Sequence, residues 1–215
     1  MPQPSGDMCR PPSWELFKRG MDLVITGGLV AVLGPMMAAI AWWVRRDSPG
    51  PAIFRQRRAG RGGRPFVLLK FRTMRTDADP YGDSPRDGAD PRLTRIGRWL
   101  REHSLDELPQ LLNVLRGDMS LVGPRPLYVQ QIAEWTDWQR RRLAVKPGLT
   151  GLAQVAGRGA LTREDKLALD VEYVMTRSTR LDLRLLWQTL AGGWRAEGIY
   201  EVRYSQDRVQ RGGDE

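Results

Sequence analysis

The sequence contains very few of the side chains that most often build metal clusters and nucleophilic triads. It has one cysteine, Cys9, and one histidine, His103, in 215 residues. A single cysteine excludes an internal disulfide framework and is typical of a reducing compartment. A single histidine excludes a histidine-based metal cluster, and no Gly-x-Ser-x-Gly turn accompanies it to indicate a hydrolase triad. We expect His103 to be a partly exposed helix residue rather than a general base.

Nucleic-acid motifs are also missing, although the chain is basic, with 34 lysines and arginines against 25 acids and a net charge of +9. Such a charge suits nucleic acid, an anionic membrane surface or a phosphorylated small molecule. There is no zinc-finger spacing, RNA-binding aromatic motif or basic zipper, and the arginines are spread along the chain. We therefore expect no nucleic-acid partner. Hydrophobic residues make up 41% of the chain, which allows a folded core.

One apolar stretch, residues 23–44, contains no charged side chain and is long enough to cross a bilayer, which takes about 20 residues. Basic pairs flank it at Lys18-Arg19 and Arg45-Arg46, and the positive-inside tendency places both ends in the cytoplasm. Gly34-Pro35 stands in its middle, where proline removes a hydrogen bond. We therefore prefer a re-entrant hairpin, which enters the membrane, bends at Pro35 and returns, to a full span. A cleaved signal peptide and a buried soluble helix are the less favoured alternatives.

The remaining pattern predicts a mostly α fold with minor β. We expect a disordered lead at 1–13, a membrane helix-break-helix at 14–46, a cytoplasmic catalytic domain with amphipathic interfacial helices at 47–195, and a polar tail at 196–215. Short strands are predicted at 53–54 and 66–71 and a mobile loop at 76–92. Helices are predicted at 93–101, 104–116, 129–145, 162–176 and 181–194. The last helix has an apolar face that suits either a membrane interface or a core.

Two adjacent acids, Asp106-Glu107, are the most informative feature of the chain. In one interpretation, Ser104 and Glu107 form a capping box that starts a helix. Pro109 would then lie inside that helix, where its missing N–H is needed. In the other interpretation the helix starts at Pro109, and both acids lie just ahead of its N-terminus. Carboxylates in that position can attack a phosphorus atom or hold Mg²⁺ against a phosphate.

Three basic or glycine-rich segments accompany the acids. Glycines among arginines at 57–64 precede Lys70-Phe-Arg72, and this arrangement suits either phosphate or anionic lipid. Gly123-Pro-Arg125-Pro126 holds one guanidinium between two stiff prolines, which suits bidentate phosphate recognition or a simple turn. A glycine-punctuated stretch at 146–158 could bend around a ligand or link two helices.

Together these motifs resemble the small monotopic phosphoglycosyl transferases, a bacterial sugar transferase family. The resemblance runs from about Lys18 to Thr189. Its densest part is Ser104-Leu-Asp-Glu-Leu-Pro-Gln-Leu-Leu-Asn-Val-Leu-Arg-Gly-Asp-Met-Ser-Leu-Val-Gly-Pro-Arg-Pro126. It also includes Phe54-x-Gln-x-Arg-x-Gly-x-x-Gly63, Lys70-Phe-Arg-Thr-Met74, Pro147-Gly-Leu-Thr-Gly-Leu-Ala-Gln-Val155, Asp170-x-x-Tyr173 and Asp182 with Thr189.

The resemblance implies transfer of a sugar-1-phosphate from a UDP-sugar to polyprenyl (undecaprenyl) phosphate, with release of UMP. Asp106 matches the family's nucleophile, which forms a covalent aspartyl-phospho-sugar intermediate. Glu107 completes the dyad, and Mg²⁺ near Asp106 and Glu107 balances the diphosphate charge. The substrate-binding residues that we carry over from the resemblance are Lys70, Arg72, Arg101, Arg125, Gln154, Arg158 and Asp182.

The resemblance also implies a location at the cytoplasmic face of the bacterial inner membrane, among its lipids, with a re-entrant helix bent at a proline that matches Pro35. Many relatives have Ser or Thr before that proline, where Gly34 stands here. The chain begins almost at the catalytic module and is expected to be a minimal form, with a homodimer left open. A basic membrane-surface adaptor without catalysis is the alternative function.

Overall fold

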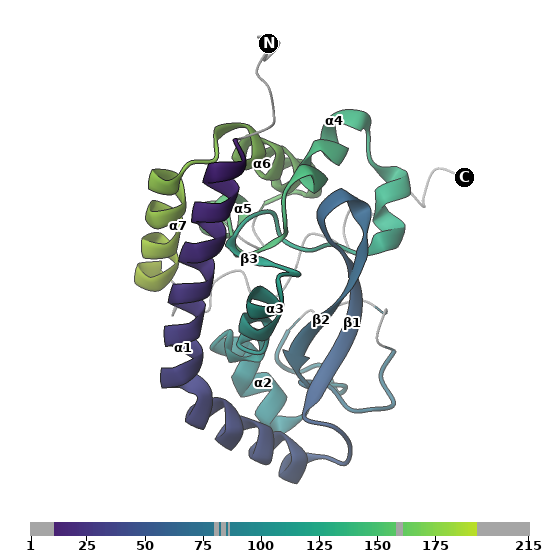
Figure 1. Cartoon of the computed structure of the whole chain (residues 1–215). Coiled ribbons are helices and arrows are strands. Elements are labelled where there is room, and N and C mark those ends of the chain that lie inside the picture. Colours follow the sequence, from purple (N-terminus) through teal and green to yellow (C-terminus); the bar gives the residue numbers. More distant parts are fainter. Residues whose placement is uncertain (1–10, 80–81, 83–84, 86, 158–160, 193–215) are drawn as a thin grey trace, which may run out of the picture.

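One long helix, α1 (Pro12–Asp47), runs along one side of the molecule, and most of the chain lies on its inner side (Figure 1). The computed structural model describes residues 11–79, 82, 85, 87–157 and 161–192. The predicted tail at 196–215, most of the predicted lead, Arg158 and Trp194 lie outside the described residues. Arg45 and Arg46 occupy the last turn of α1, where their charges complement the helix dipole.

The helix continues through Gly34 and Pro35, where we expected a break. Pro35 lies inside α1, and Figure 1 shows the helix bending in the half that contains it. A proline removes one backbone hydrogen bond, which bends a helix without necessarily ending it. The expected helix-break-helix is therefore corrected to one bent helix, while its re-entrant course through a bilayer stays a prediction.

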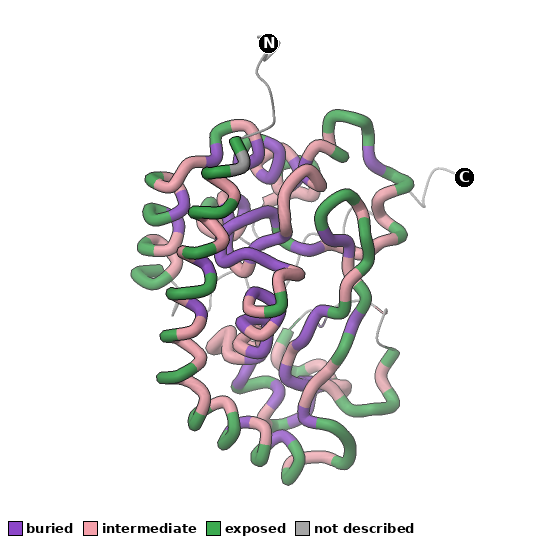
Figure 2. The backbone as a smooth tube through the Cα atoms, viewed as in Figure 1, coloured by how far each residue is buried: buried purple, intermediate pink, exposed green. Residues whose placement is uncertain are grey.

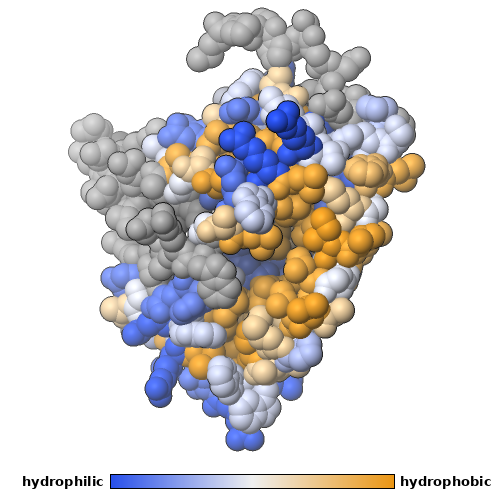
Figure 3. Space-filling model, turned by 90° about the vertical axis from the view of Figure 1, so that its left-hand side faces the viewer, coloured by the Kyte–Doolittle hydropathy of each residue, from blue (hydrophilic) through white to orange (hydrophobic). Residues whose placement is uncertain are grey.

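Along its first half, α1 turns polar side chains toward the protein and apolar side chains outward. Asp22 and Thr26 are buried against the rest of the chain, whereas Leu16, Phe17 and Val24 point outward. Only 11% of its most apolar window is buried, so α1 is not a core helix. Figure 2 shows exposed and partly buried residues along nearly all of α1, and Figure 3 shows hydrophobic side chains gathered on this side of the molecule.

Both halves of α1 are attached to the same body. Near its start, Asp22 accepts hydrogen bonds from Ser120 Oγ (2.8 Å) and from the Leu121 N–H (3.2 Å). Near its end, the Asp47 carboxylate accepts from the Ile96 N–H at 3.1 Å. A core cluster joins this second half to the following elements through Ile40, Val44, Ala52, Phe71 and Leu100. The two halves of α1 are therefore held against one body by polar and apolar contacts.

An antiparallel hairpin follows α1, as the sequence predicted. Its strands are β1 (Ile53–Ala59) and β2 (Pro65–Phe71), paired from Ile53 with Phe71 to Ala59 with Pro65. The first strand is longer than predicted. The turn contains a short 3₁₀ segment, η1 (Arg61–Gly63), in which Gly62 and Gly63 have positive φ, a conformation that favours glycine.

A second, parallel strand pair at the centre of the molecule was not predicted. It joins β3 (Ser120–Val122) to β4 (Gly148–Thr150). Gly123 and Gly148 bring the two backbones together, because a Cβ added at Gly148 would lie 2.1 Å from the Gly123 nitrogen. The main core packs around this pair and around α3 (Gln110–Arg116), with Leu68, Leu111, Val114, Met119, Leu121, Val122, Tyr173, Val174 and Leu185 buried.

The predicted helix at 129–145 is wrong as a single element. It consists of η3 (Val129–Glu134), α4 (Asp137–Arg140) and η4 (Arg141–Ala144). The chain is extended at Trp135, which is buried, and Thr136 then starts a new helix through a capping box with Gln139. The apolar spacing that predicted one helix comes from side chains on separate short turns.

The C-terminal helices agree with the sequence prediction more closely. Helix α6 (Arg163–Thr176) begins at the Thr162 cap, whose hydroxyl accepts from the Asp165 N–H. Helix α7 (Thr179–Gly192) replaces the expected 181–194, and a short helix that was not expected, α5 (Leu152–Ala156), precedes α6. The mostly helical class with minor sheet is thereby confirmed.

The outer face of α7 is exposed rather than packed in the core, and its place at a membrane interface stays a prediction. Leu183, Trp187 and Leu190 are 51%, 70% and 69% exposed, whereas Leu185 faces the core. The described chain therefore leaves this apolar face uncovered, next to the outward face of α1.

Candidate active site

The acid pair lies in a tight turn between two helices. Helix α2 (Arg95–Glu102) ends at His103, and a 3₁₀ turn, η2 (Leu105–Glu107), carries both acids. Ser104 has φ 53° and its side chain makes no capping hydrogen bond, so the capping-box interpretation is wrong. Pro109 is the N-cap of α3, which confirms the other interpretation. Both acids therefore stand just ahead of α3.

Glu107 is held by two cations from distant segments. Lys70 Nζ on β2 lies 2.8 Å from Glu107 Oε1, and Arg125 Nη2 lies 2.7 Å from the same oxygen. A second guanidinium nitrogen of Arg125, Nη1, reaches Oε2 at 3.4 Å. Arg125 stays 46% exposed at its side chain, so it can also reach a ligand.

Arg101 completes the basic surroundings from the last turn of α2. Its Nε donates to Thr73 Oγ1 at 3.0 Å, which fixes the side chain near the end of β2. Gly97 permits this close approach, because a Cβ there would lie 2.0 Å from the Thr73 carbonyl oxygen. The Arg101 charge acts on Asp106, lowering the pKa of its carboxyl group.

The pKa values of the two carboxyl groups are shifted in opposite directions by their surroundings. Burial raises the pKa of Asp106, the Lys70 charge opposes that shift, and the neighbouring Glu107 adds to it. Burial would also raise the pKa of Glu107, but Arg125 and Lys70 outweigh it through charge and hydrogen bonds and hold that pKa below its ordinary value. Two adjacent acids whose pKa values are pushed apart indicate a division of roles.

A buried ion pair supports Arg125 from behind, and no sequence motif had suggested it as a pair. Arg142, in η4, donates to Asp170 Oδ2 on α6 from Nε at 3.0 Å and from Nη2 at 2.6 Å. The same Nη2 donates to the Arg125 backbone carbonyl at 2.5 Å. Both side chains are almost completely buried, at 2% and 4% exposure. This pair therefore holds the backbone from which Arg125 reaches Glu107.

A sequence model described as bacterial sugar transferase matches residues 13–195, which is most of the chain. The chain belongs to this family.

Curated relatives agree with that membership. A UDP-glucose:undecaprenyl-phosphate glucose-1-phosphate transferase of Caulobacter vibrioides is 45% identical over 82% of this chain and 69% of its own length. EpsL of Bacillus subtilis, described as an uncharacterized sugar transferase, is 42% identical over 93% of this chain and 98% of its own length. A UDP-glucose:undecaprenyl-phosphate glucose-1-phosphate transferase of Escherichia coli is 38% identical, and the match covers only 42% of that protein.

The structure brings five of the predicted site residues together: Lys70, Arg101, Asp106, Glu107 and Arg125. The others are placed differently or not described.

Arg72 does not reach the acids through any contact found in the described chain. Its guanidinium donates to the Pro51 carbonyl, to Ser48 and, less closely, to the Val44 carbonyl. These contacts hold the end of α1, and they give no support to a substrate-binding role for this arginine.

Asp182 and Gln154 also make no contact with the acid pair within the described residues. Asp182 is fully buried and accepts from Lys18 Nζ at 2.5 Å and from the Tyr173 hydroxyl at 2.8 Å. It thereby joins α7 to the start of α1. Both amide atoms of Gln154, on α5, are buried and have no hydrogen-bond partner within the described ranges, so this residue stays a candidate for a ligand.

Proposed function

We propose that the chain transfers a sugar-1-phosphate from a UDP-sugar to polyprenyl phosphate at a membrane surface. The observation that carries this proposal is the acid pair with Lys70, Arg101 and Arg125 around it, in a chain whose outward helix faces are apolar. Basic side chains offset the charge of a diphosphate, and the apolar faces bring the site to a lipid substrate. The named activities of the Caulobacter and Escherichia relatives agree with this reaction.

In the first step, an Asp106 carboxylate oxygen attacks the β-phosphorus of the UDP-sugar. A bond forms between that oxygen and phosphorus, the bond from phosphorus to the bridging oxygen breaks, and UMP leaves with the electron pair. Lys70, Arg101 and Arg125 carry the positive charge that this step requires on the phosphate oxygens. In the second step, a phosphate oxygen of the polyprenyl phosphate attacks the same phosphorus, and the carboxylate of Asp106 is released.

Asp106 is the better placed of the two acids for attack. It is buried in the turn, and no hydrogen bond to its carboxylate is found among the described residues, whereas Glu107 accepts from both Lys70 and Arg125. Glu107 therefore orients the two cations and keeps a negative charge beside the site. This assignment divides the acids into a nucleophile and an orienting group.

Mg²⁺ is the cofactor that fits this donor set. Within the described ranges, no group of three or more His, Cys, Asp or Glu side chains gathers to enclose a metal. Mg²⁺ commonly takes one or two carboxylates and fills its other positions with water and substrate phosphates. Asp106 would hold it, with Glu107 as the adjacent carboxylate, and the ion would supply positive charge to the diphosphate.

The proposed attachment is a re-entrant helix that dips into the cytoplasmic face of the inner membrane. It is supported by the basic pairs at both ends of α1, by its apolar outward side, and by the attachment of both of its halves to one body. The uncovered face of α7 adds an interfacial helix.

The experiment that tests the reaction is release of UMP from a panel of UDP-sugars by purified enzyme in the presence of polyprenyl phosphate and Mg²⁺. Asp106→Asn should abolish release, because an amide is a poor nucleophile, while Asp137→Asn, at a fully exposed side chain on α4, should leave it unchanged. Full activity in Asp106→Asn would refute the assigned nucleophile. Normal membrane association without UMP release from any UDP-sugar would favour the adaptor.

A further inference from the structure

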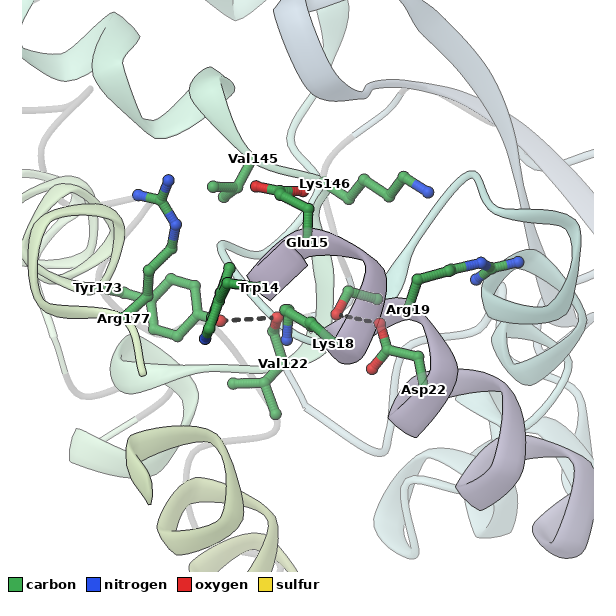
Figure 4. Close-up of a pocket in the computed structure, with 11 residues that line it drawn as sticks. Trp14, Glu15, Lys18, Arg19, Asp22, Val122, Val145, Lys146, Tyr173 and Arg177 are labelled. Carbon is green, nitrogen blue, oxygen red and sulfur yellow. Dashed lines mark hydrogen bonds between the residues drawn. The ribbon is translucent and has the colours of Figure 1, made fainter. Parts of the chain in front are cut away.

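A charged pocket opens beside the first turns of α1, apart from the acid pair (Figure 4). Its charged lining residues are Glu15, Lys18, Arg19, Asp22, Lys146 and Arg177. Arg19 donates to the Val114 and Leu115 carbonyls at the end of α3, at 2.6 and 2.9 Å. The acid pair precedes the start of α3, so the pocket and the acids lie at opposite ends of that helix.

The pocket is bordered by a helix with one charged face and one apolar face. Positions 15, 18, 19 and 22 follow the spacing of one helical face, and this face lines the pocket. Leu16 and Phe17 stand on the outward face, 73% and 59% exposed. The same turns of α1 therefore offer positive charge on the pocket side and apolar surface on the outward side.

Most cations of the pocket already have partners. Lys18 pairs with Asp182, Arg19 caps the carbonyl end of α3, and Arg177 donates to the Val174 carbonyl. The four cations exceed the two acids of the lining. The surplus falls mainly on Lys146.

Lys146 is a half-buried cation with no hydrogen bond or ion pair in the part of the chain that the structure describes. It lies beside another cation, because a Cβ added at Gly117 would be 3.6 Å from Lys146 Nζ and 3.4 Å from Arg19 Nη2. Figure 4 shows both side chains extending to the same side of the pocket. Burial lowers the pKa of Lys146, and the Arg19 charge lowers it further, although Asp22 and Glu15 act in the opposite direction. A bound anion would offset the repulsion between the Lys146 and Arg19 charges.

We propose that this pocket binds the phosphate of an anionic phospholipid from the bilayer, with Lys146 and Arg19 as its contacts. Arg19 uses two of its five N–H groups on carbonyls and keeps others for a phosphate oxygen. The acyl chains lie along Leu16 and Phe17, and basic pockets beside membrane helices are suited to such headgroups. The proposal rests on the proposed membrane attachment but not on the transfer reaction.

Two other sources of phosphate fit the pocket less well. Polyprenyl phosphate must bring its phosphate to Asp106, at the other end of α3. A free phosphate ion would make no use of the apolar outward face of α1 at Leu16 and Phe17. We therefore assign the site to a bilayer phospholipid, and each alternative is a distinguishable result of the test.

The test measures the rise in melting temperature of the purified protein in neutral detergent as short-chain phosphatidylglycerol is added. The wild type should show a saturable rise, and short-chain phosphatidylcholine should give none. Lys146→Met should need about ten times more phosphatidylglycerol for the same rise, the effect of losing one charge-assisted contact. Arg45→Met, which removes an exposed cation at the other end of α1, should behave as the wild type, and Lys146→Arg should retain the response.

Several results would overturn the proposal. Equal losses in Lys146→Met and Arg45→Met would show a general effect of charge. A response to inorganic phosphate at the same concentration would show a free-anion site. An equal dependence on Lys146 for polyprenyl phosphate would show a site for the acceptor. The melting temperature of Lys146→Met without lipid shows whether this variant is folded. Absence of a phosphatidylglycerol response in the wild type and in a stable Lys146→Arg would also contradict the site. UMP release is a separate measurement, so failure of the transfer reaction leaves the lipid result readable.

Discussion

Asp170→Asn should both destabilise the protein strongly and lower its rate of UMP release. The substitution removes the charge that two Arg142 nitrogens contact at 3.0 and 2.6 Å, in a pair that is almost completely buried. Leaving one partner of a buried pair uncompensated costs about 3–5 kcal/mol. For a domain of this size each 1 kcal/mol corresponds to about 2–4 °C, so the melting temperature should fall by roughly 6–20 °C. Thermal unfolding in neutral detergent, followed by tryptophan fluorescence, measures the change.

A double variant separates stability from positioning. Arg142→Met with Asp170→Leu removes both charges, and apolar replacements of buried pairs are often neutral or stabilising. Its melting temperature should therefore recover most of the loss. The hydrogen bond from Arg142 to the Arg125 carbonyl is still absent, so UMP release should stay reduced. A melting temperature for Asp170→Asn within about 2 °C of the wild type, below the 1 kcal/mol level, would refute the reasoning.

Four further outcomes are expected. Gly97→Ala should lower the free energy of unfolding by about 1–3 kcal/mol and reduce UMP release, since its Cβ would lie 2.0 Å from the Thr73 carbonyl oxygen. Chemical unfolding measures the free energy, and an unchanged value would contradict the close approach. Lys70→Met should lower kcat/KM for the UDP-sugar about 100-fold, as loss of one charge-stabilising donor does, whereas Lys166→Met should not. Chelation by EDTA should stop UMP release, and added Mg²⁺ should restore it; full activity in EDTA would exclude the assigned metal. Trp187→Gln, at a side chain 70% exposed, should lower binding to neutral vesicles several-fold without changing the melting temperature in detergent.

Local signals in the sequence predicted the elements whose causes are local. The Thr162 cap starts α6, the glycines after Ala59 turn the hairpin, and Pro109 marks the start of α3. Each of these depends on a side chain or backbone preference within a few residues. The acid pair, Lys70 and Arg125 were candidates from the local sequence, and the resemblance to a family assigned their roles.

Features that depend on tertiary contact were not predictable in the same way. Strands β3 and β4 have three residues each, too few to show a strand pattern in the sequence. They pair because the backbones at Gly123 and Gly148 lie in close contact in the folded protein. Residues 129–145 have the apolar spacing of one helix, but the backbone is extended at the buried Trp135, which divides the segment into short helical turns. Arg72 looked like a phosphate ligand beside Lys70, but it follows the last residue of β2, and its guanidinium is held by the Pro51 and Ser48 carbonyls at the end of α1.

The most direct test of the central claim is the intact mass of the enzyme after mixing with UDP-sugar and Mg²⁺ in the absence of polyprenyl phosphate. The account predicts an added phospho-sugar mass, located by peptide mapping on the peptide that contains Asp106 and absent from Asp106→Asn. The added mass should disappear when polyprenyl phosphate is supplied. UMP release that requires both substrates together, with no added mass on the enzyme at any time, would contradict the covalent intermediate and the role of Asp106 as nucleophile.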